Sequence, residues 1–119
     1  MRKRFGTMPW AEYVASDIIA RPVFGTFVMI ESRTYRVTGR VQGVGFRWFT
    51  WDAAMREGVV GFVRNLPDGS VEAVVEGERE ALDRFEWKIS SGPAGGRVDH
   101  VDRETGPATG RFQDFSIKG

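Results

Sequence analysis

The feature that most constrains the fold of this chain is its order of periodic segments. Two segments have helical periodicity, and each lies between segments that alternate apolar and polar residues. The helical segments are 47–57 and 78–91, and the second places Leu82, Phe85 and Ile89 on a single stripe. The alternating segments predict short strands at 35–41, 59–64, 70–76, 98–103 and 112–117. A chain with this order has to bury one face of a sheet under two amphipathic helices.

Turn residues separate these segments. Gly58 stands where a helix ends, Gly92 and Pro93 end the second helical segment, and residues 65–69 (NLPDG) predict a tight turn between two strands. The order is therefore β-α-β-β-α-β with a short additional C-terminal strand. We predict an α+β fold of the ferredoxin-like type, a βαββαβ sandwich in which an antiparallel sheet carries both helices on one face.

The first 32 residues lack this clear periodicity. They open with basic residues, but polar residues and a proline interrupt the apolar run that a secretory signal needs, at Pro9, Glu12, Ser16 and Asp17. We therefore expect an N-terminal extension over 1–32 and one domain over 33–119. Met29 lies just before the first strand, so the extension is either a partly flexible segment or the product of a start codon placed too far upstream.

Composition excludes several classes of site. Cysteine is absent and His100 is the single histidine, which excludes disulfides, cysteine nucleophiles and histidine clusters for metals. The 17 basic and 16 acidic residues give a formal charge of +1, and no apolar run approaches the ~18 residues that cross a bilayer. We expect a cytoplasmic monomer without a metal, a nucleic-acid partner or a membrane partner.

The passage from the first strand into the first helix predicts an anion site. Residues 39–47 read GRVQGVGFR, so Gly43 and Gly45 stand directly before the helix and Arg47 lies in its first turn. Unpaired amides at a helix start, a glycine-rich turn and a guanidinium all favour a phosphate group. The alternative is that the glycines only make a tight turn, since Trp48 replaces the third glycine of a dinucleotide-binding motif.

Two stretches of the chain carry a resemblance to a known family. Residues 39–47 follow the pattern G-x-V-Q-G-V-x-F-R, and residues 61–65 follow G-x-V-x-N and precede a turn that contains Gly69. With both patterns at this separation, the sequence from about 33 to 119 resembles the acylphosphatase family. Phe62 stands where that family usually has tryptophan, and Glu57 stands where it usually has an aliphatic residue.

The resemblance implies a hydrolase that cleaves the carboxyl–phosphate anhydride of small-molecule acyl phosphates without a cofactor. It implies that Arg47 and Asn65 are the catalytic residues, with Asn65 positioning the attacking water. It also implies a phosphate-binding loop made of Gly43, Val44, Gly45, Phe46 and Arg47. Such a mechanism suits phosphoryl transfer, in which positioning and electrostatics dominate and a carboxylate leaves without protonation.

Other interpretations are open for the whole chain. A non-catalytic module of the same fold could bind an acyl phosphate or another phosphorylated metabolite. RNA-recognition domains share the element order, but the basic residue and paired aromatics that stack bases are missing.

Several individual residues also have a non-catalytic interpretation. Gln42 more simply braces the loop than contacts a ligand, and His100 has a surface role. Trp48 and Trp51 either cover the mouth of the site or pack against the extension. The acidic run Glu76, Glu78 and Glu80 reads as a solvated helix start.

Overall fold

The computed structural model describes residues 19–23 and 26–119 of the chain, with side chains from Met29 onward. In chain order the elements are β1 (Ile19–Val23), β2 (Thr26–Arg40), α2 (Phe46–Glu57), β3 (Val60–Asn65), β4 (Val71–Glu78), α3 (Arg79–Ser91), β5 (Arg97–Pro107) and β6 (Phe115–Lys118). The predicted order of helices and strands from residue 35 onward is confirmed. Strand β2 begins well before the predicted strand and crosses the expected boundary between residues 32 and 33.

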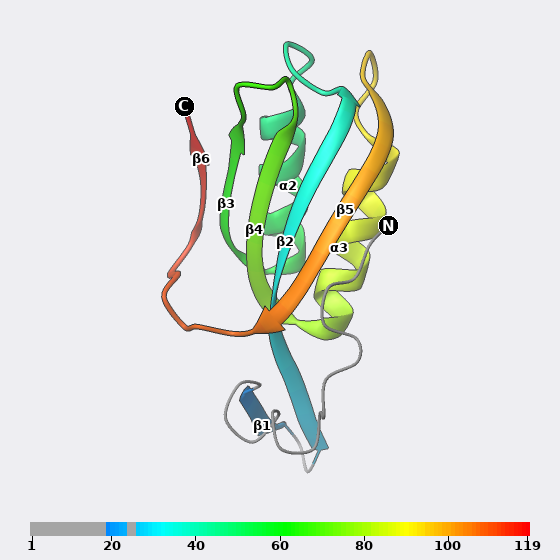
Figure 1. The fold of residues 1–119 in the computed structure, drawn as a ribbon. Helices are drawn as coiled ribbons and strands as arrows, with labels where there is room; N and C mark the ends of the chain where they lie inside the picture. The colour runs from blue at the N-terminus through cyan, green and yellow to red at the C-terminus, as the bar shows by residue number, and fades with distance from the viewer. Residues whose placement is uncertain (1–18, 24–25) are drawn as a thin grey trace.

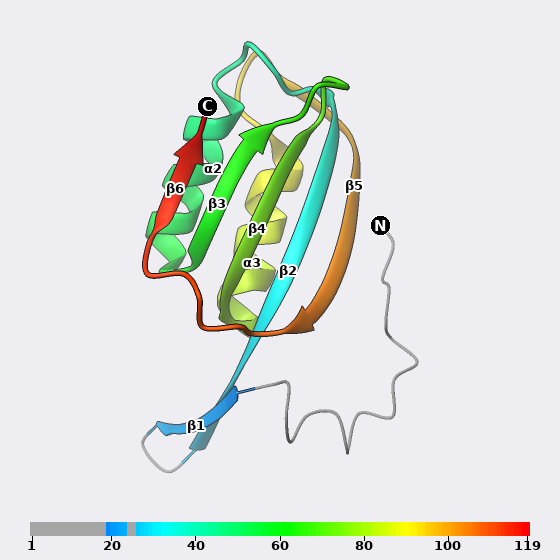
Figure 2. The same ribbon diagram turned by 60° about the vertical axis from the view of Figure 1, so that its left-hand side comes forward.

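The strands form one sheet in the order β5-β2-β4-β3-β6, with β1 paired to the first part of β2. Helices α2 and α3 both cover the same face of this sheet (Figures 1 and 2). The ferredoxin-like α+β sandwich is therefore confirmed.

One feature of the predicted sheet is wrong: the sheet is mixed rather than antiparallel throughout, because β6 pairs with β3 in parallel. After β5 the chain crosses to the opposite edge along the end of the sheet where β3 begins (Figure 1). From there β6 can only run in the same direction as β3.

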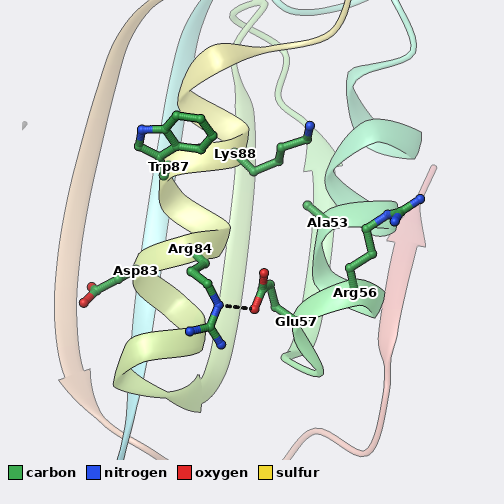
Figure 3. Close-up of a pocket in the computed structure, with 7 residues that line it drawn as sticks. All are labelled: Ala53, Arg56, Glu57, Asp83, Arg84, Trp87 and Lys88. Carbon is green, nitrogen blue, oxygen red and sulfur yellow. Dashed lines mark hydrogen bonds and ion pairs between the residues drawn. The ribbon is translucent and has the colours of Figure 1, made fainter.

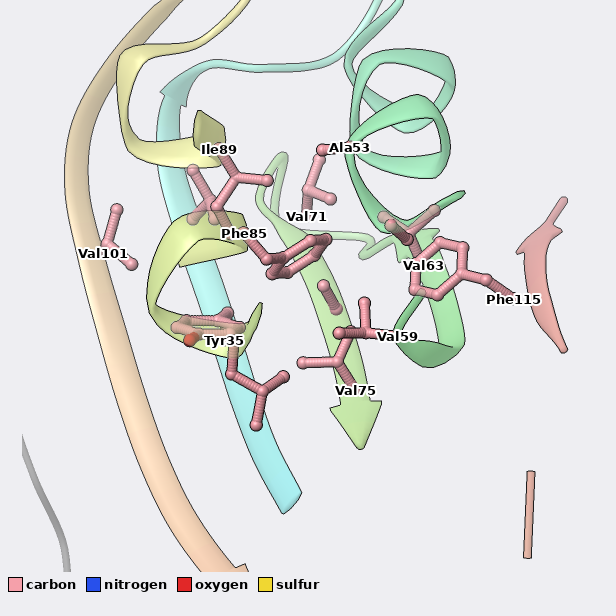
Figure 4. Close-up of a cluster of buried hydrophobic side chains, with 14 of the residues drawn as sticks. Tyr35, Ala53, Val59, Val63, Val71, Val75, Phe85, Ile89, Val101 and Phe115 are labelled. Carbon is pink, nitrogen blue, oxygen red and sulfur yellow. The ribbon is translucent and has the colours of Figure 1, made fainter. Parts of the chain in front are cut away.

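The apolar core lies between the sheet and the two helices (Figure 4). Its largest fully buried side chains come from β2 and α3, namely Tyr35, Phe85, Leu82 and Ile89. The stripe predicted for the second helix is thus buried. Helix α2 contributes small residues, Ala53 and Ala54, which let it approach the sheet closely.

A buried cluster of charged groups adjoins this core, and local periodicity did not reveal it. Arg33 is 3% exposed; its Nε donates to Glu31 at 2.8 Å and its Nη2 to Asp83 at 2.7 Å. The Tyr35 hydroxyl donates to Glu86 at 2.9 Å. Burial raises the pKa of this hydroxyl, Glu86 adds to the rise and the Arg33 guanidinium opposes it, so the hydroxyl stays protonated as a donor.

The prediction that Glu76 belongs to a solvated helix start is wrong. Strand β4 continues to Glu78, and Glu76 within it is 4% exposed. Its carboxylate accepts hydrogen bonds from the Thr109 amide at 3.0 Å, the Thr109 hydroxyl at 2.6 Å and the Gly110 amide at 3.0 Å. Glu76 therefore anchors the connection that carries the chain from β5 to β6.

We expect a chain that begins at Met29 to fold, with a free energy of unfolding within about 1 kcal/mol of that of the full chain. The shorter chain keeps the residues through which β2 pairs with β4 and β5, from Ile30 onward. It also keeps Glu31, which pairs with Arg33 and with Arg79 at 3.0 Å. Urea unfolding followed by circular dichroism measures the difference.

A variant of the shorter chain tests whether the contacts of Glu31 contribute to this stability. Glu31→Ala in the shorter chain should lower the free energy of unfolding by roughly 2–3 kcal/mol, because Arg33 stays buried with one partner fewer. A large loss of stability in the shorter chain itself would show that residues 1–28 stabilise the domain.

Candidate active site

The loop before α2, the end of β3 and the C-terminal strand meet at one end of the sheet (Figure 1). They enclose a cavity of about 240 Å³, called here the loop cavity, which is lined by Val41, Gly43, Gly45, Phe46, Arg47, Trp48, Asn65 and Ile117. The structure thus brings together all the predicted site residues except Val44, which packs against the core beside the cavity.

Backbone geometry at the loop leaves the start of α2 open. Gly43 and Gly45 have φ angles of 75° and 78°, in the left-handed region that glycine adopts without strain. Gly45 is the N-cap residue and offers no side-chain cap, and the first helical hydrogen bond runs from the Phe49 amide to the Gly45 carbonyl at 3.0 Å. The preceding amides of the first turn therefore have no partner within the helix, and they carry the positive end of its dipole.

Gln42 ties this loop to the turn after β3. Its Nε2 donates to the Leu66 carbonyl at 2.8 Å and to the Ser70 carbonyl at 2.9 Å. The expected bracing role of Gln42 is confirmed. Because Asn65 precedes Leu66 directly, the same two bonds fix the position of Asn65 relative to the loop.

Arg47 is held by the last strand of the sheet. Its Nη1 donates to the Lys118 carbonyl at 2.9 Å, and among the described residues this is its one hydrogen-bond acceptor. A guanidinium has five N–H donors, so most of them are left for an anion in the cavity. This contact depends on the parallel pairing of β6 and could not be read from local sequence patterns.

Asn65 presents an unsatisfied polar atom beside the cavity. Its Oδ1 is buried and has no hydrogen-bond partner among the described residues. Buried amide oxygens nearly always accept a hydrogen bond, so this oxygen, which solvent hardly reaches in the present rotamer, gains a partner only if the carboxamide turns toward the cavity. The carboxamide also supplies donors, which suits it to orient a water molecule.

The other residues singled out in the sequence lie outside the cavity, apart from Trp48. His100 is exposed on β5, with its Nε2 3.4 Å from an Asp102 oxygen. Trp48 lines the cavity and contacts Trp51 edge-on, at 4.9 Å between ring centroids.

Among the residues that the structure describes, no group of three acidic or histidine side chains could hold a metal, and no helix is long and apolar enough to cross a membrane.

A larger hollow lies elsewhere, between α2 and α3. It measures about 450 Å³ and is lined by Ala53, Arg56, Glu57, Asp83, Arg84, Trp87 and Lys88 (Figure 3). Its acidic groups already have partners, since Glu57 accepts from Arg84 at 2.7 Å and Asp83 accepts from Arg33. It contains no helix start and none of the predicted site residues, so we place the candidate site at the loop cavity.

Comparisons with a family model and with individual proteins all match the chain to one family. The sequence model of the acylphosphatase family matches residues 33–117. The acylphosphatase of Koribacter versatilis is 45% identical over 89 residues, which are 75% of this chain and 81% of that protein. The acylphosphatase of Lactobacillus johnsonii is 48% identical over 85 residues, which are 71% of this chain and 93% of that protein.

Solved structures agree with the sequence matches. The crystal structure of acylphosphatase from Bacillus subtilis superposes with a TM-score of 0.72 at 34% identity, and the match covers 76% of this chain and all of that one. The acylphosphatase structure from Coxiella burnetii gives a TM-score of 0.70 at 30% identity, over 75% of this chain and 93% of that one.

We expect Gln42→Ala to lower the free energy of unfolding by about 1 kcal/mol, because the Leu66 and Ser70 carbonyls each lose one of two donors and keep only a backbone amide. Gln42→Glu should be at least as harmful, since its carboxylate would face those carbonyls with acceptors only. Urea unfolding monitored by tryptophan fluorescence measures both variants. Wild-type stability in Gln42→Glu would show that the two bonds do not hold the loop.

Proposed function

The chain belongs to the acylphosphatase family of hydrolases, and on that premise we propose that its loop cavity hydrolyses acyl phosphates to a carboxylate and inorganic phosphate. One observation carries the proposal: an open helix start, a guanidinium and an unsatisfied carboxamide line the same small cavity. The first two suit the phosphoryl group, and the third suits a water molecule.

In the proposed complex the phosphoryl oxygens accept hydrogen bonds from the amides of residues 43–47 and from the Arg47 guanidinium. The positive end of α2 and the fixed charge of Arg47 stabilise the negative charge that these oxygens carry. Phosphoryl transfer has a loose transition state and requires little covalent chemistry from the protein. Positioning and charge stabilisation by these groups therefore lower most of the activation free energy.

Asn65 holds the attacking water in the proposed mechanism. The water oxygen forms a bond to phosphorus while the bond from phosphorus to the acyl oxygen breaks and leaves its electron pair on the carboxylate. One proton of the water stays on its oxygen, and the other passes to a phosphoryl oxygen of the substrate. None of the residues that line the cavity is an acid or a histidine. A carboxylate leaving group needs no general acid, so none is required.

A non-catalytic module that binds a phosphorylated metabolite is the alternative, and the unpaired Asn65 oxygen favours catalysis over it. Binding of an anion requires donors, whereas an orphan acceptor beside the anion suits a water molecule. Action as a monomer in the cytoplasm stays a prediction from the sequence.

We expect Arg47→Ala to weaken the binding of inorganic phosphate and to reduce kcat by about 10²-fold or more, since the guanidinium contacts charge in the ground state and the transition state. Arg47→Lys should recover little, because an ammonium lacks the planar two-point contact. Phosphate inhibition constants and turnover of acetyl phosphate measure the two effects.

Asn65→Ala should affect phosphate affinity and kcat differently from Arg47→Ala. We expect phosphate affinity close to that of the wild type and a kcat lowered by roughly 10²-fold, because a bound anion does not need the positioned water. Circular dichroism and melting curves control for folding. Wild-type kcat in Asn65→Ala would disprove the water-positioning role and leave Asn65 as a brace for the turn after β3.

The rate should depend little on pH. An arginine stays protonated and a carboxamide does not ionise, so we expect kcat to change by less than about twofold between pH ~5.5 and ~7.5. Initial rates across this range, with saturating acetyl phosphate, measure it. His100→Gln should have the same profile, and a limb present in the wild type but absent from this variant would restore a catalytic role to His100.

A further inference from the structure

The loop cavity adjoins a second hollow that the mechanism has not used. This outer hollow measures about 460 Å³ and is lined by Val44, Gly45, Trp48, Phe49 and Asp52. Gly45 and Trp48 line both spaces. A molecule whose phosphoryl group occupies the loop cavity can therefore extend past Trp48 without leaving the protein surface.

The outer hollow has an apolar, preorganised wall. Trp48 is 56% exposed, and an indole this exposed beside a cavity offers a large contact surface. Its orientation is set by the edge-on contact with Trp51, which itself packs against the core. Phe49 continues the wall, and Lys88 lies over its ring with Nζ 5.5 Å from the centroid.

The geometry of the reaction directs the leaving group of the substrate toward the outer hollow. In an in-line displacement, the leaving oxygen departs on the side of phosphorus opposite the attacking water. Asn65, which is proposed to hold the water, lines the loop cavity but not the outer hollow. The leaving group therefore has to point away from Asn65, and the outer hollow is an adjoining space that excludes this residue.

We propose that the outer hollow binds the acyl group of the substrate and that Trp48 determines which acyl phosphates the enzyme prefers. This inference rests on the proposed function. The preferred acyl groups are apolar and planar or branched, since these cover the indole of Trp48 and the ring of Phe49.

The test compares benzoyl phosphate with acetyl phosphate on the full chain and three variants. Trp48→Ala should lower the ratio of kcat/KM for benzoyl phosphate to that for acetyl phosphate by roughly tenfold, because the phenyl ring loses its contact surface. Trp48→Phe should retain most of the ratio. Trp87→Ala is the matched control: Trp87 is also exposed but lies on α3 at the interhelical hollow, and its loss should leave the ratio unchanged.

An unchanged ratio in Trp48→Ala would overturn the proposal, whether kcat/KM for the two substrates falls equally or not at all. Absence of wild-type turnover with either substrate would instead refute the proposed function. In that case the binding of benzoylphosphonate and acetylphosphonate, measured by calorimetry, still decides the acyl site. A preference for benzoylphosphonate that Trp48→Ala abolishes supports it, and an equal affinity for both compounds in the wild type overturns it.

Discussion

The left-handed conformation of Gly45 is the constraint on which both the packing and the site depend. It turns the chain from β2 into α2 within a few residues, so the helix lies directly over the sheet that it leaves. Ala53 and Ala54 then reach the core. A residue with a capping side chain would satisfy the first amides of α2, whereas glycine leaves them open toward the cavity. One backbone requirement thus produces a packed helix and an open helix start together.

The site also depends on contacts between segments that are distant in the sequence. The Gln42 amide joins the loop to the turn that follows Asn65, and the Lys118 carbonyl joins Arg47 to the C-terminal strand. Strand β6 reaches that place because Glu76 anchors the chain between β5 and β6. Arg47 and Asn65 are therefore each positioned by contacts with segments other than their own elements, which fix them more closely than their own rotamer preferences.

Local patterns in the sequence predicted the elements and the glycine loop with Arg47, because periodicity and turn chemistry act over a few residues, whereas Asn65 was implied only by the resemblance to the acylphosphatase family. They did not predict the direction of β6, the partner of Arg47 or the burial of Glu76. These depend on which strand lies beside which, and a strand carries the same alternation whether its neighbour is parallel or antiparallel. Arg33 was missed for a related reason: its acidic partners lie on α3 and beside it on β2, so its burial is decided by tertiary packing.

In the proposed function, the loop cavity recognises what all acyl phosphates share. The helix start and Arg47 would bind the phosphoryl group and Asn65 the water, which are the same for every substrate of the class, so they would supply no means to distinguish one acyl group from another. Discrimination has to come from side chains that contact the acyl group in the transition state. Trp48 is the large side chain that lines both spaces, so in the proposed enzyme it serves selectivity while Arg47, its neighbour in the first turn of α2, serves catalysis.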